Sequence, residues 1–343
     1  MKITMLSYHG CIRVVKMALP LLKKGHEVNL ITFRLPSQSK KFTSIVVCND
    51  MENMQEAVKI YEPITDIFHC HNEPSWFVTM VKELTSKPVI LDVHDTFLTR
   101  SEPENQIKGV YREITDERNN FYLADGLNFC TDYVRDDVYK HYNLTQPSLV
   151  LPSYVPANWY QYDGLEWLGG LVYEGKVMLK TETVGISAGF NYCDYEDLAK
   201  QCTEMNMAFH IYTVRTDNAY LDTYKGIALL HEPCGILDLV SFLTRHDWGL
   251  VGNSFRSSQW QRTSSNKMFE YIAAGIPPVV MNAQWSAGFV NREEVGIVVE
   301  SVEELGKRWG EHRPQRANLV KRRYDFAMEN HIHELEEFYK VFL

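Results

Sequence analysis

Short apolar, β-branched runs alternate with helical stretches from the first residue of this chain, and this alternation limits what the chain can fold into. Residues 1–6 (MKITML) are typical of a strand, residues 11–25 carry apolar side chains at helical spacing, and residues 26–33 are again apolar and β-branched. Such strand–helix–strand units form right-handed crossovers and build a parallel sheet with helices on its faces. The opening of the chain therefore predicts an α/β fold.

The same alternation starts again in the C-terminal half. We expect strands in GGLVYEG (169–175), AFHIYTV (208–214) and WGLVGN (248–253), with helical patterns between them. A second doubly wound sheet is therefore predicted.

The length of the chain and one non-periodic segment divide it into domains. A single hydrophobic core rarely grows beyond about 250–300 residues, so a chain of 343 residues favours two domains. Residues 158–164 combine turn-forming and aromatic residues without a period, which puts the boundary there. We predict an N-terminal Rossmann-like domain over 1–160, a C-terminal Rossmann-like domain over 161–318, and a terminal helix over 319–343 that crosses back to the N-terminal domain.

Cysteine usage and charge exclude several classes of protein. The seven cysteines are odd in number and form no Cys-x-x-Cys pair, so we expect reduced thiols rather than a zinc site or a disulfide framework. The net charge of −9 argues against a general nucleic-acid binder. No long uninterrupted apolar stretch resembles a signal peptide or membrane-spanning helix, so we expect a cytoplasmic protein.

The charge is unevenly distributed in the first segment. Only Glu27 opposes a series of seven basic residues, which are Arg13, Lys16, Lys23, Lys24, Arg34, Lys40 and Lys41. One interpretation is an ordinary set of solvated helix and loop charges. The other is a basic N-terminal face that meets an acceptor or makes peripheral contact with the inner surface of a membrane.

The stretch from Ser264 to Asn282 is the most informative part of the sequence. A helical pattern begins after Ser264, Ser265 and Asn266, and Gly275 followed by two prolines ends it. In doubly wound sheets, ligands bind at the carboxyl ends of the strands, where helix N-termini offer unpaired N–H groups to an anion. This helix start therefore fits a diphosphate. The alternative is a plain Ser/Asn helix cap with nothing bound.

Residues 265–282 (SNKMFEYIAAGIPPVVMN) resemble the donor-site helix of GT-B glycosyltransferases, particularly the retaining family 4 enzymes and their short relatives. The family pattern is Lys-x-x-Glu-Tyr-x-Ala-x-Gly-x-Pro-Val-Val. The resemblance implies that Glu270 hydrogen-bonds the ribose hydroxyls of a nucleotide, and that the helix start through Lys267 binds the diphosphate. Arg262 stands where the family often has a second glutamate, so the contacts to the donor sugar do not carry over.

The resemblance extends to two glycines at strand ends. Gly175 ends a predicted strand, and Lys176 and Lys180 are the nearest match to the basic pair that binds the diphosphate in the family; solvated loop lysines are the alternative. Gly10 follows the first strand, where it would let a donor phosphate or an acceptor approach the backbone. The local sequence lacks GxGxxG, which argues against a nicotinamide dehydrogenase.

His94 and Asp95 directly follow a strand predicted to be buried. The resemblance implies that His94 hydrogen-bonds the donor sugar, and a carboxylate such as Asp95 is suited to deprotonate an acceptor hydroxyl. The alternative is a core histidine and a capping aspartate. His69 and His71 share one strand face but offer only two ligands, and no Asp-x-Asp motif is present, so we expect no metal.

Together, these features predict a GT-B fold in which two Rossmann-like domains face each other across a cleft and the C-terminal helix packs back. The resemblance implies a hexosyltransferase-type glycosyltransferase (EC 2.4) that is retaining, metal-independent and free of cofactors. Its donor would be a UDP- or GDP-sugar, and its acceptor a glycan, a lipid-linked sugar or a modified DNA base. The alternatives are a viral-type enzyme acting on modified DNA bases, a nucleotide-sugar 2-epimerase and a non-catalytic nucleotide-sugar-binding relative.

Overall fold

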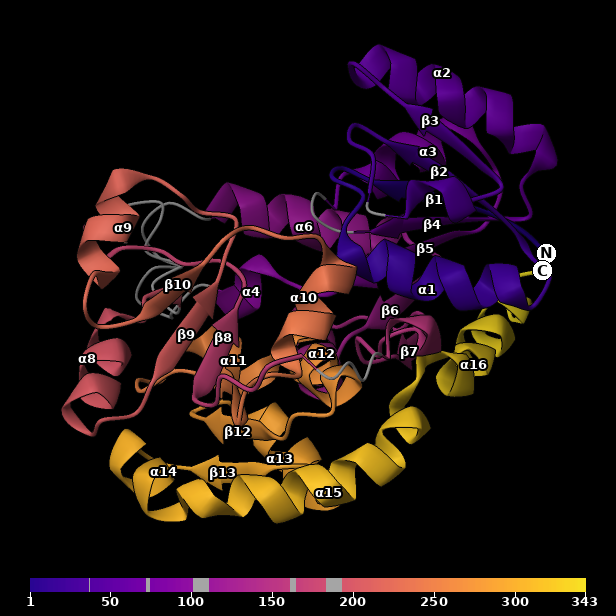
Figure 1. Cartoon of the computed structure of the whole chain (residues 1–343). Coiled ribbons are helices and arrows are strands. Elements are labelled where there is room, and N and C mark those ends of the chain that lie inside the picture. The colour runs from indigo at the N-terminus through magenta and orange to yellow at the C-terminus, as the bar shows by residue number, and fades with distance from the viewer. Residues whose placement is uncertain (37, 72–74, 101–110, 161–164, 183–192) are drawn as a thin grey trace. The chain divides into compact units, whose positions relative to one another are not determined.

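The computed structural model describes residues 1–36, 38–71, 75–100, 111–160, 165–182 and 193–343 (Figure 1). These residues form two compact units. Within the described residues, unit 1 contains 1–99, 111–156 and 328–343, and unit 2 contains 100, 157–160, 165–182 and 193–327. The chain thus passes between units after Pro156 and again after Ala327.

Unit 1 is built on a seven-stranded parallel sheet with the order β3-β2-β1-β4-β5-β6-β7. Strands β1, β4 and β5 are central and almost entirely buried, which explains why apolar residues dominate them. The strands are β1 (Lys2–Ser7), β2 (Glu27–Thr32), β3 (Ser44–Val47), β4 (Ile67–His71), β5 (Val89–Val93), β6 (Gly126–Phe129) and β7 (Ser148–Val150).

Side-chain caps start two of the unit 1 helices, α2 and α7. The side chain of Thr131 accepts a hydrogen bond from the N–H of Val134 at the start of α7, and Asn143 ends that helix in the left-handed conformation. The helices are α1 (Ile12–Lys23), α2 (Met51–Tyr61), α3 (Phe77–Leu84), α4 (Phe97–Arg100), α6 (Tyr111–Leu123), α7 (Asp132–Tyr142) and α16 (Met328–Lys340).

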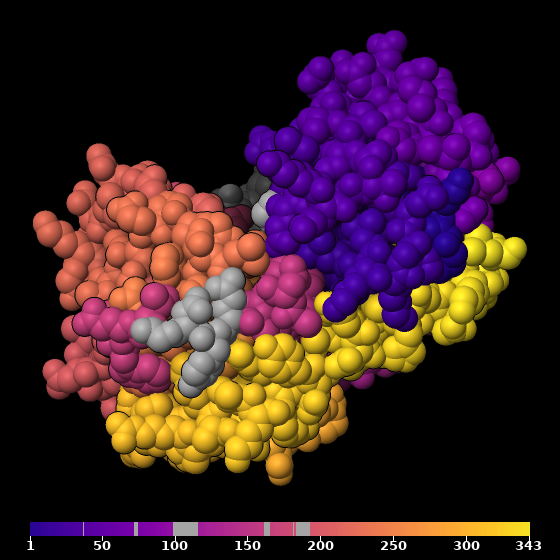
Figure 2. Space-filling view, turned by 45° about the vertical axis from the view of Figure 1, so that its right-hand side comes forward, coloured from indigo at the N-terminus to yellow at the C-terminus, as the bar shows by residue number. Residues whose placement is uncertain are grey.

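The C-terminal helix α16 belongs to unit 1. It packs against α1 and beside β7, and its yellow surface adjoins the indigo surface of α1 in Figure 2. The Tyr339 hydroxyl lies 2.6 Å from His69 Nδ1 beneath the sheet. This helix begins at Met328 rather than at 319, because a 3₁₀ turn (η7, Arg323–Phe326) and the extended residue Ala327 interrupt the helical pattern.

Unit 2 is built on a six-stranded parallel sheet with the order β10-β9-β8-β11-β12-β13. Its strands are β8 (Leu171–Glu174), β9 (Phe209–Tyr212), β10 (Leu229–His231), β11 (Trp248–Gly252), β12 (Pro278–Met281) and β13 (Ile297–Val299). Its helices are α8 (Glu196–Glu204), α9 (Asn218–Tyr224), α10 (Ile236–Leu243), α11 (Ser258–Arg262), α12 (Asn266–Ala274), α13 (Gln284–Glu293), α14 (Val302–Arg308) and α15 (His312–Arg322). The two doubly wound sheets predicted from the sequence are confirmed.

One tyrosine anchors α12 to the centre of this sheet. The Tyr271 hydroxyl donates to the carbonyl of Val172 (3.3 Å) and accepts from the N–H of Glu174 (3.2 Å), both in β8. Its ring lies on Gly249 of β11, where an added Cβ would sit only 2.3 Å from Tyr271 Cγ. Gly275, in the left-handed conformation, then ends the helix, as the sequence predicts.

We therefore expect Gly249→Ala to destabilise unit 2 by about 3 kcal/mol, because the tightly packed Tyr271 ring has to move. Gly288→Ala is the matched control: Gly288 lies within α13 and has no atom within 4 Å of an added Cβ, so alanine there is expected to stabilise by about 0.5–1 kcal/mol. Chemical denaturation of the three proteins measures the difference. Equal stability of Gly249→Ala and wild type would contradict this packing.

Candidate functional site

The start of α12 carries two buried hydroxyls without a hydrogen-bond partner. Ser265 immediately precedes the helix, and neither its Oγ nor that of Ser264 has a partner among the described residues. The two residues are only 6% and 9% exposed, respectively. Buried hydroxyls are normally hydrogen-bonded, and the first N–H groups of a helix have no intrahelical acceptor. Together with the positive end of the helix dipole, these donors suit an anion.

Lys267, in the first turn of α12, brings a positive charge to the end of β8. A Cβ on Gly175, whose φ is +122°, would lie 2.7 Å from Lys267 Cε and 2.9 Å from Nζ. The ammonium also lies 5.5 Å from the centroid of the Tyr173 ring and 6.0 Å from that of Trp260. No carboxylate among the described residues pairs with it. The structure thus brings together Gly175 and Lys267, which come from separate motifs.

A cavity of about 490 Å³ lies at the carboxyl ends of β8, β9 and β10. Lys176 lines it, but Lys180 is not among its described lining residues and instead pairs with Asp197 at 2.8 Å on the surface. The described lining residues are Glu174, Gly175, Lys176, Val177, Tyr212, Thr213, Val214, Arg215, Glu232, Cys234 and Leu239. Of the two predicted lysines, only Lys176 is placed to meet a ligand in this cavity.

Glu270 lies one turn into α12 and is 3% exposed. Its carboxylate is therefore buried in unit 2, within the helix whose start carries Ser264, Ser265 and Asn266. Arg262 ends the preceding short helix α11. Glu270 therefore lies in α12, the helix that the sequence pattern assigns to nucleotide binding.

Unit 1 contains a larger cavity, of about 950 Å³, at the carboxyl ends of β1 and β5. His94 lines it, whereas Asp95 is not among its described lining residues. Its walls mix aromatic and polar side chains, including Tyr8, Cys11, Trp76, His94, Phe97 and Glu117. Aromatic surfaces beside a few polar groups are typical of small-molecule sites.

Gly10 has a left-handed backbone conformation and packs closely against the segment around Pro36. Its φ is +54°, and an added Cβ would lie 2.8 Å from Pro36 and 2.9 Å from the carbonyl of Arg34. Pro36 therefore fills the space that the missing side chain leaves. The neighbouring residues Tyr8, His9 and Cys11 line the cavity instead.

A buried polar network surrounds Asp92 behind this cavity. The Arg13 guanidinium donates to both carboxylate oxygens, with Nε 2.8 Å from Oδ2 and Nη2 2.9 Å from Oδ1. His71 Nδ1 and His94 Nδ1 lie 3.3 and 3.4 Å from Oδ2, and the Asn128 amide donates to Oδ1 at 2.7 Å. Asp92 was not among the residues predicted from the sequence, although a carboxylate inside the apolar run VILDV indicates a buried ion pair.

This network sets the charges at the cavity. Burial opposes ionisation of Asp92, but Arg13 and the two histidines hold the pKa of its carboxyl well below the usual range. Burial also opposes protonation of His94, but the hydrogen bond to Asp92 outweighs it and raises the pKa of His94 to about 9. At neutral pH, His94 therefore faces the cavity as an imidazolium, which donates hydrogen bonds and cannot accept a proton.

The same histidines act on Cys11, the residue that precedes α1. Burial raises the pKa of its thiol, but a hydrogen bond with His71 and the nearby charges of His94 and His71 bring the pKa to about 7.

We expect the rate at which iodoacetamide alkylates Cys11 to increase with pH, with a midpoint near 7. Peptide mass spectrometry measures the rate at each pH. Cys234 is the internal control, because it is also partly exposed and its pKa is raised by burial. A common midpoint for both thiols would contradict the proposed influence of the histidines.

The basic N-terminal face predicted from the sequence is wrong in part. Arg13 and Lys16 are 1% and 0% exposed, because Arg13 neutralises Asp92 and the Lys16 ammonium donates to the carbonyl of Ser153 at 3.3 Å. Lys24 pairs with Glu336 of α16, and Lys23 lies 3.7 Å from Glu329. Only Arg34, Lys40 and Lys41 of the original seven are exposed and without an ion pair among the described residues.

His69 and His71 stack at 4.5 Å between ring centroids, and each has a separate role. His69 meets the Tyr339 hydroxyl, while His71 meets Asp92. Over the described part of the chain, the one group of three or more residues that could hold a metal ion is His210, His231 and His246 in unit 2. Within that same part, no helix is long and apolar enough to cross a membrane.

No protein-family model and no curated protein sequence matches this chain. Its structure is similar to a sucrose-phosphate synthase from Thermosynechococcus elongatus (TM-score 0.75, 12% identity, 99% of this chain and 98% of that one). HepE of Anabaena, solved with UDP-glucose, has a TM-score of 0.70, 11% identity and coverage of 98% and 99%. An alpha-glucosyltransferase solved with UDP and a 13-mer DNA containing an HMU base has a TM-score of 0.62, 12% identity and coverage of 99% of both chains. The chain therefore has the GT-B fold of these glycosyltransferases, as its sequence predicts.

Proposed function

We propose that this protein is a glycosyltransferase that binds a nucleotide-diphosphate sugar in unit 2. The observation that carries the proposal is the start of α12: the Lys267 ammonium, which has no carboxylate partner in the described part of the chain, lies beside the end of β8 with the buried hydroxyls of Ser264 and Ser265 nearby. A cavity of nucleotide size adjoins this group at Gly175. Similar solved structures contain UDP or UDP-glucose, so a UDP-sugar is the first donor to test.

The chemistry of this group suits the departure of a diphosphate. Negative charge builds on the leaving oxygen as the glycosidic bond to the donor breaks, and preorganised donors that meet this charge lower the barrier. Lys267 supplies a full positive charge, and the helix start supplies N–H donors and the dipole. Glu270, buried in the same helix, is proposed to hold the ribose hydroxyls.

The proposed reaction is retaining and metal-independent. In a retaining transfer, the leaving phosphate can take the proton of the acceptor hydroxyl, so the chain need not provide a base. This agrees with the state of His94, which is protonated at neutral pH and is suited to donate a hydrogen bond rather than to accept a proton. Asp95 is not among the described residues that line the unit 1 cavity, so we give it no role in transfer.

The unit 1 cavity is proposed to bind the acceptor. Tyr8, Trp76 and Phe97 offer flat apolar surfaces, and His94 offers a charged donor, which together suit a sugar-like acceptor. Glu83, Asp116 and Glu117 also line the cavity, and burial removes Arg13 and Lys16 from the surface. An acidic rim and a weakened basic face disfavour the phosphate backbone of DNA, so we favour a glycan or lipid-linked acceptor over a DNA base.

The test is a thermal-shift and nucleotide-release screen with UDP-, GDP-, ADP- and TDP-sugars on wild type and on Glu270→Ala. A ligand that binds only the folded state raises the melting temperature by mass action. We expect one nucleotide-sugar to stabilise the wild type and to be slowly hydrolysed, and Glu270→Ala to lose both effects. Glu204→Ala, on the exposed surface of α8, is the control and should behave as wild type.

Four outcomes would contradict the proposal, or its acceptor, in different ways. Failure of every nucleotide-sugar to bind would remove the donor site, and binding without hydrolysis or transfer to any glycan would indicate a non-catalytic relative. Conversion of the free nucleotide-sugar to its 2-epimer would indicate an epimerase. Salt-sensitive binding to duplex DNA, together with glucosylation of a modified base, would show that the acceptor is a DNA base rather than a glycan or lipid-linked sugar.

A further inference from the structure

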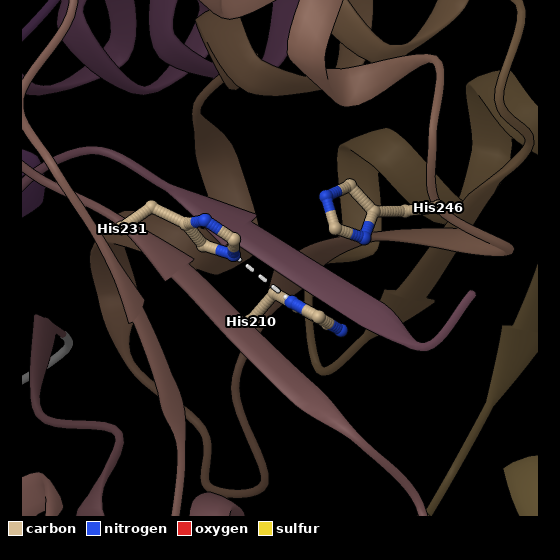
Figure 3. Close-up of side chains that lie close together, drawn as sticks. All are labelled: His210, His231 and His246. Atoms are coloured by element: carbon tan, nitrogen blue, oxygen red, sulfur yellow. Dashed lines mark hydrogen bonds between the residues drawn. The ribbon is translucent and has the colours of Figure 1, made fainter. Parts of the chain in front are cut away.

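Three histidines of unit 2 gather away from the proposed diphosphate group. They come from separate segments: His210 lies in β9, His231 ends β10, and His246 lies just before β11. The parallel register pairs Leu229 with His210 and therefore brings His231 to the same neighbourhood. Figure 3 shows the three rings around a common space, and one ring nitrogen from each lies within 4.8 Å of the others.

The hydrogen bonds of these rings indicate which ring nitrogens can offer a lone pair to a metal ion. His246 Nδ1 lies 2.9 Å from the carbonyl oxygen of Gly169, which can only accept, so Nδ1 carries the hydrogen and Nε2 carries the lone pair. A backbone carbonyl that orients a histidine in this way is the usual support of a metal-binding imidazole. His210 Nδ1 and His231 Nε2 lie 2.9 Å apart and share one hydrogen.

The surroundings keep the three rings neutral and give them room. Burial lowers the pKa of His210 to about 4 and that of His246 to about 3, and burial and Arg245 also lower the pKa of His231. Neutral imidazole is the form that binds metal ions. Space for the His210 ring exists because Gly170 has no side chain: a Cβ there would lie 2.8 Å from His210 Cδ2.

We propose that His210, His231 and His246 bind one divalent transition-metal ion of the zinc class. Two zinc–nitrogen bonds of about 2.0–2.1 Å at the tetrahedral angle place their nitrogens about 3.3 Å apart, so the His210 and His231 rings need to separate by only a few tenths of an ångström. The hydrogen that now lies between them moves to the other nitrogen of its own ring. The Tyr212 hydroxyl, 3.3 Å from His246 Nε2, is within reach as a fourth ligand.

The ion would act as a structural tie rather than as part of the transfer reaction. It would join β9, β10 and the segment before β11, which are held now by ring stacking and hydrogen bonds such as the parallel stack of Tyr212 on His231 (4.0 Å, 2°). His231 is partly exposed, which gives the ion a route from solvent, whereas His210 and His246 are 3% and 0% exposed. The proposal is independent of which sugar, if any, the protein transfers.

The test uses the full chain without a polyhistidine tag, treated with a chelator and then titrated with zinc against a chromophoric competitor. We expect one zinc ion per chain and a higher melting temperature when zinc is present. His231→Gln is expected to weaken zinc binding by more than about 100-fold. This exceeds the loss of about 10- to 100-fold that is typical when only a group hydrogen-bonded to a metal ligand is removed. His333→Gln, on the exposed surface of α16, is the control and should bind zinc as wild type does.

Cobalt replaces zinc in a second measurement, because the seven cysteines are alternative ligands. Tetrahedral cobalt bound by imidazoles absorbs visible light without thiolate-to-metal charge transfer. A thiolate band, or stoichiometric zinc binding that persists in His231→Gln, would overturn the proposal, as would wild type that binds no zinc. His231 is only partly buried, and circular dichroism together with unchanged nucleotide-sugar binding would verify that its variant is folded.

Discussion

Replacing Lys267 with methionine is expected to weaken binding of a nucleoside diphosphate by about 10- to 100-fold, because a charge-assisted hydrogen bond contributes about 1.5–3 kcal/mol. Turnover should fall further, by about 100- to 1000-fold, since the ammonium meets charge that grows as the diphosphate leaves. Methionine keeps the apolar stem that lies beside Tyr173 and Trp260 and removes only the charge. The binding constant is measured by calorimetry with UDP, and turnover by release of the nucleotide.

The structure offers a matched control for this substitution. Lys180 follows the end of β8 and was predicted, together with Lys176, as the nearest match to the basic pair that binds the diphosphate, but its ammonium pairs with Asp197 and both groups are more than half exposed. Lys180→Met is therefore expected to leave binding and turnover unchanged within about twofold, and surface ion pairs contribute at most about 1 kcal/mol to stability. Equal losses in the two variants would show that the site depends on general positive charge rather than on the start of α12.

A second comparison separates binding from catalysis. If Lys267 acts mainly on the leaving group, Lys267→Met lowers kcat more than it raises KM. If the variant raises KM alone, then the lysine holds the donor equally in the ground state and the transition state. Unchanged kcat/KM would remove Lys267 from the site and leave the proposed diphosphate contacts to the helix N–H groups and the hydroxyls of Ser264 and Ser265.

Much of the fold could be predicted because it follows from periodicity that is local in sequence. Buried parallel strands are mostly apolar runs, which are visible in the sequence. The helix that ends at Gly275 is also predictable, because a glycine followed by two prolines indicates a helix end. The predicted terminal helix is less accurate. Helical propensity continues through η7, but there Arg323 donates to the carbonyl of Ala273, a tertiary contact that no local pattern contains.

The candidate site could be predicted only where its residues lie in one continuous segment of the sequence. Residues 264–270 form the start of one helix, so their spacing follows directly from the sequence. By contrast, Arg13 reads as a surface charge on a helix, and only the pairing of β1, β4 and β5 shows that it turns inward to Asp92. Strand register likewise brings His231 near His210, and His246 joins them from the segment before β11.

Asp92→Asn is the substitution with the largest expected effect on stability, about 3–5 kcal/mol within unit 1. It removes the carboxylate that neutralises Arg13, and charged groups left buried without a partner are costly. His71 and His94 lose the same partner, so three basic side chains would converge on a neutral amide. Asp125→Asn is the control: Asp125 pairs with Lys82 at 2.7 Å and accepts from the N–H of Val89, but it is 35% exposed. Asparagine keeps an oxygen that can accept from Val89, so losing the ion pair should cost at most about 1 kcal/mol.

The loss of stability in Asp92→Asn depends on pH in a defined direction. In the wild type, Asp92 holds the pKa of His71 and His94 above the unfolded value of about 6.5, so these groups add stability that is present below pH 6.5 and is lost as the pH rises through the folded pKa, about 9 for His94. In Asp92→Asn, burial beside Arg13 depresses both pKa values, and protonation below pH 6.5 favours the unfolded chain. The difference in unfolding free energy between wild type and variant therefore increases as the pH falls from 8 to 5.5. Hydrogen exchange of peptides from β4 to β6, at pH 8 and at pH 5.5, measures this difference within unit 1. A difference that decreases on acidification would show that His71 and His94 do not depend on Asp92 for their charge.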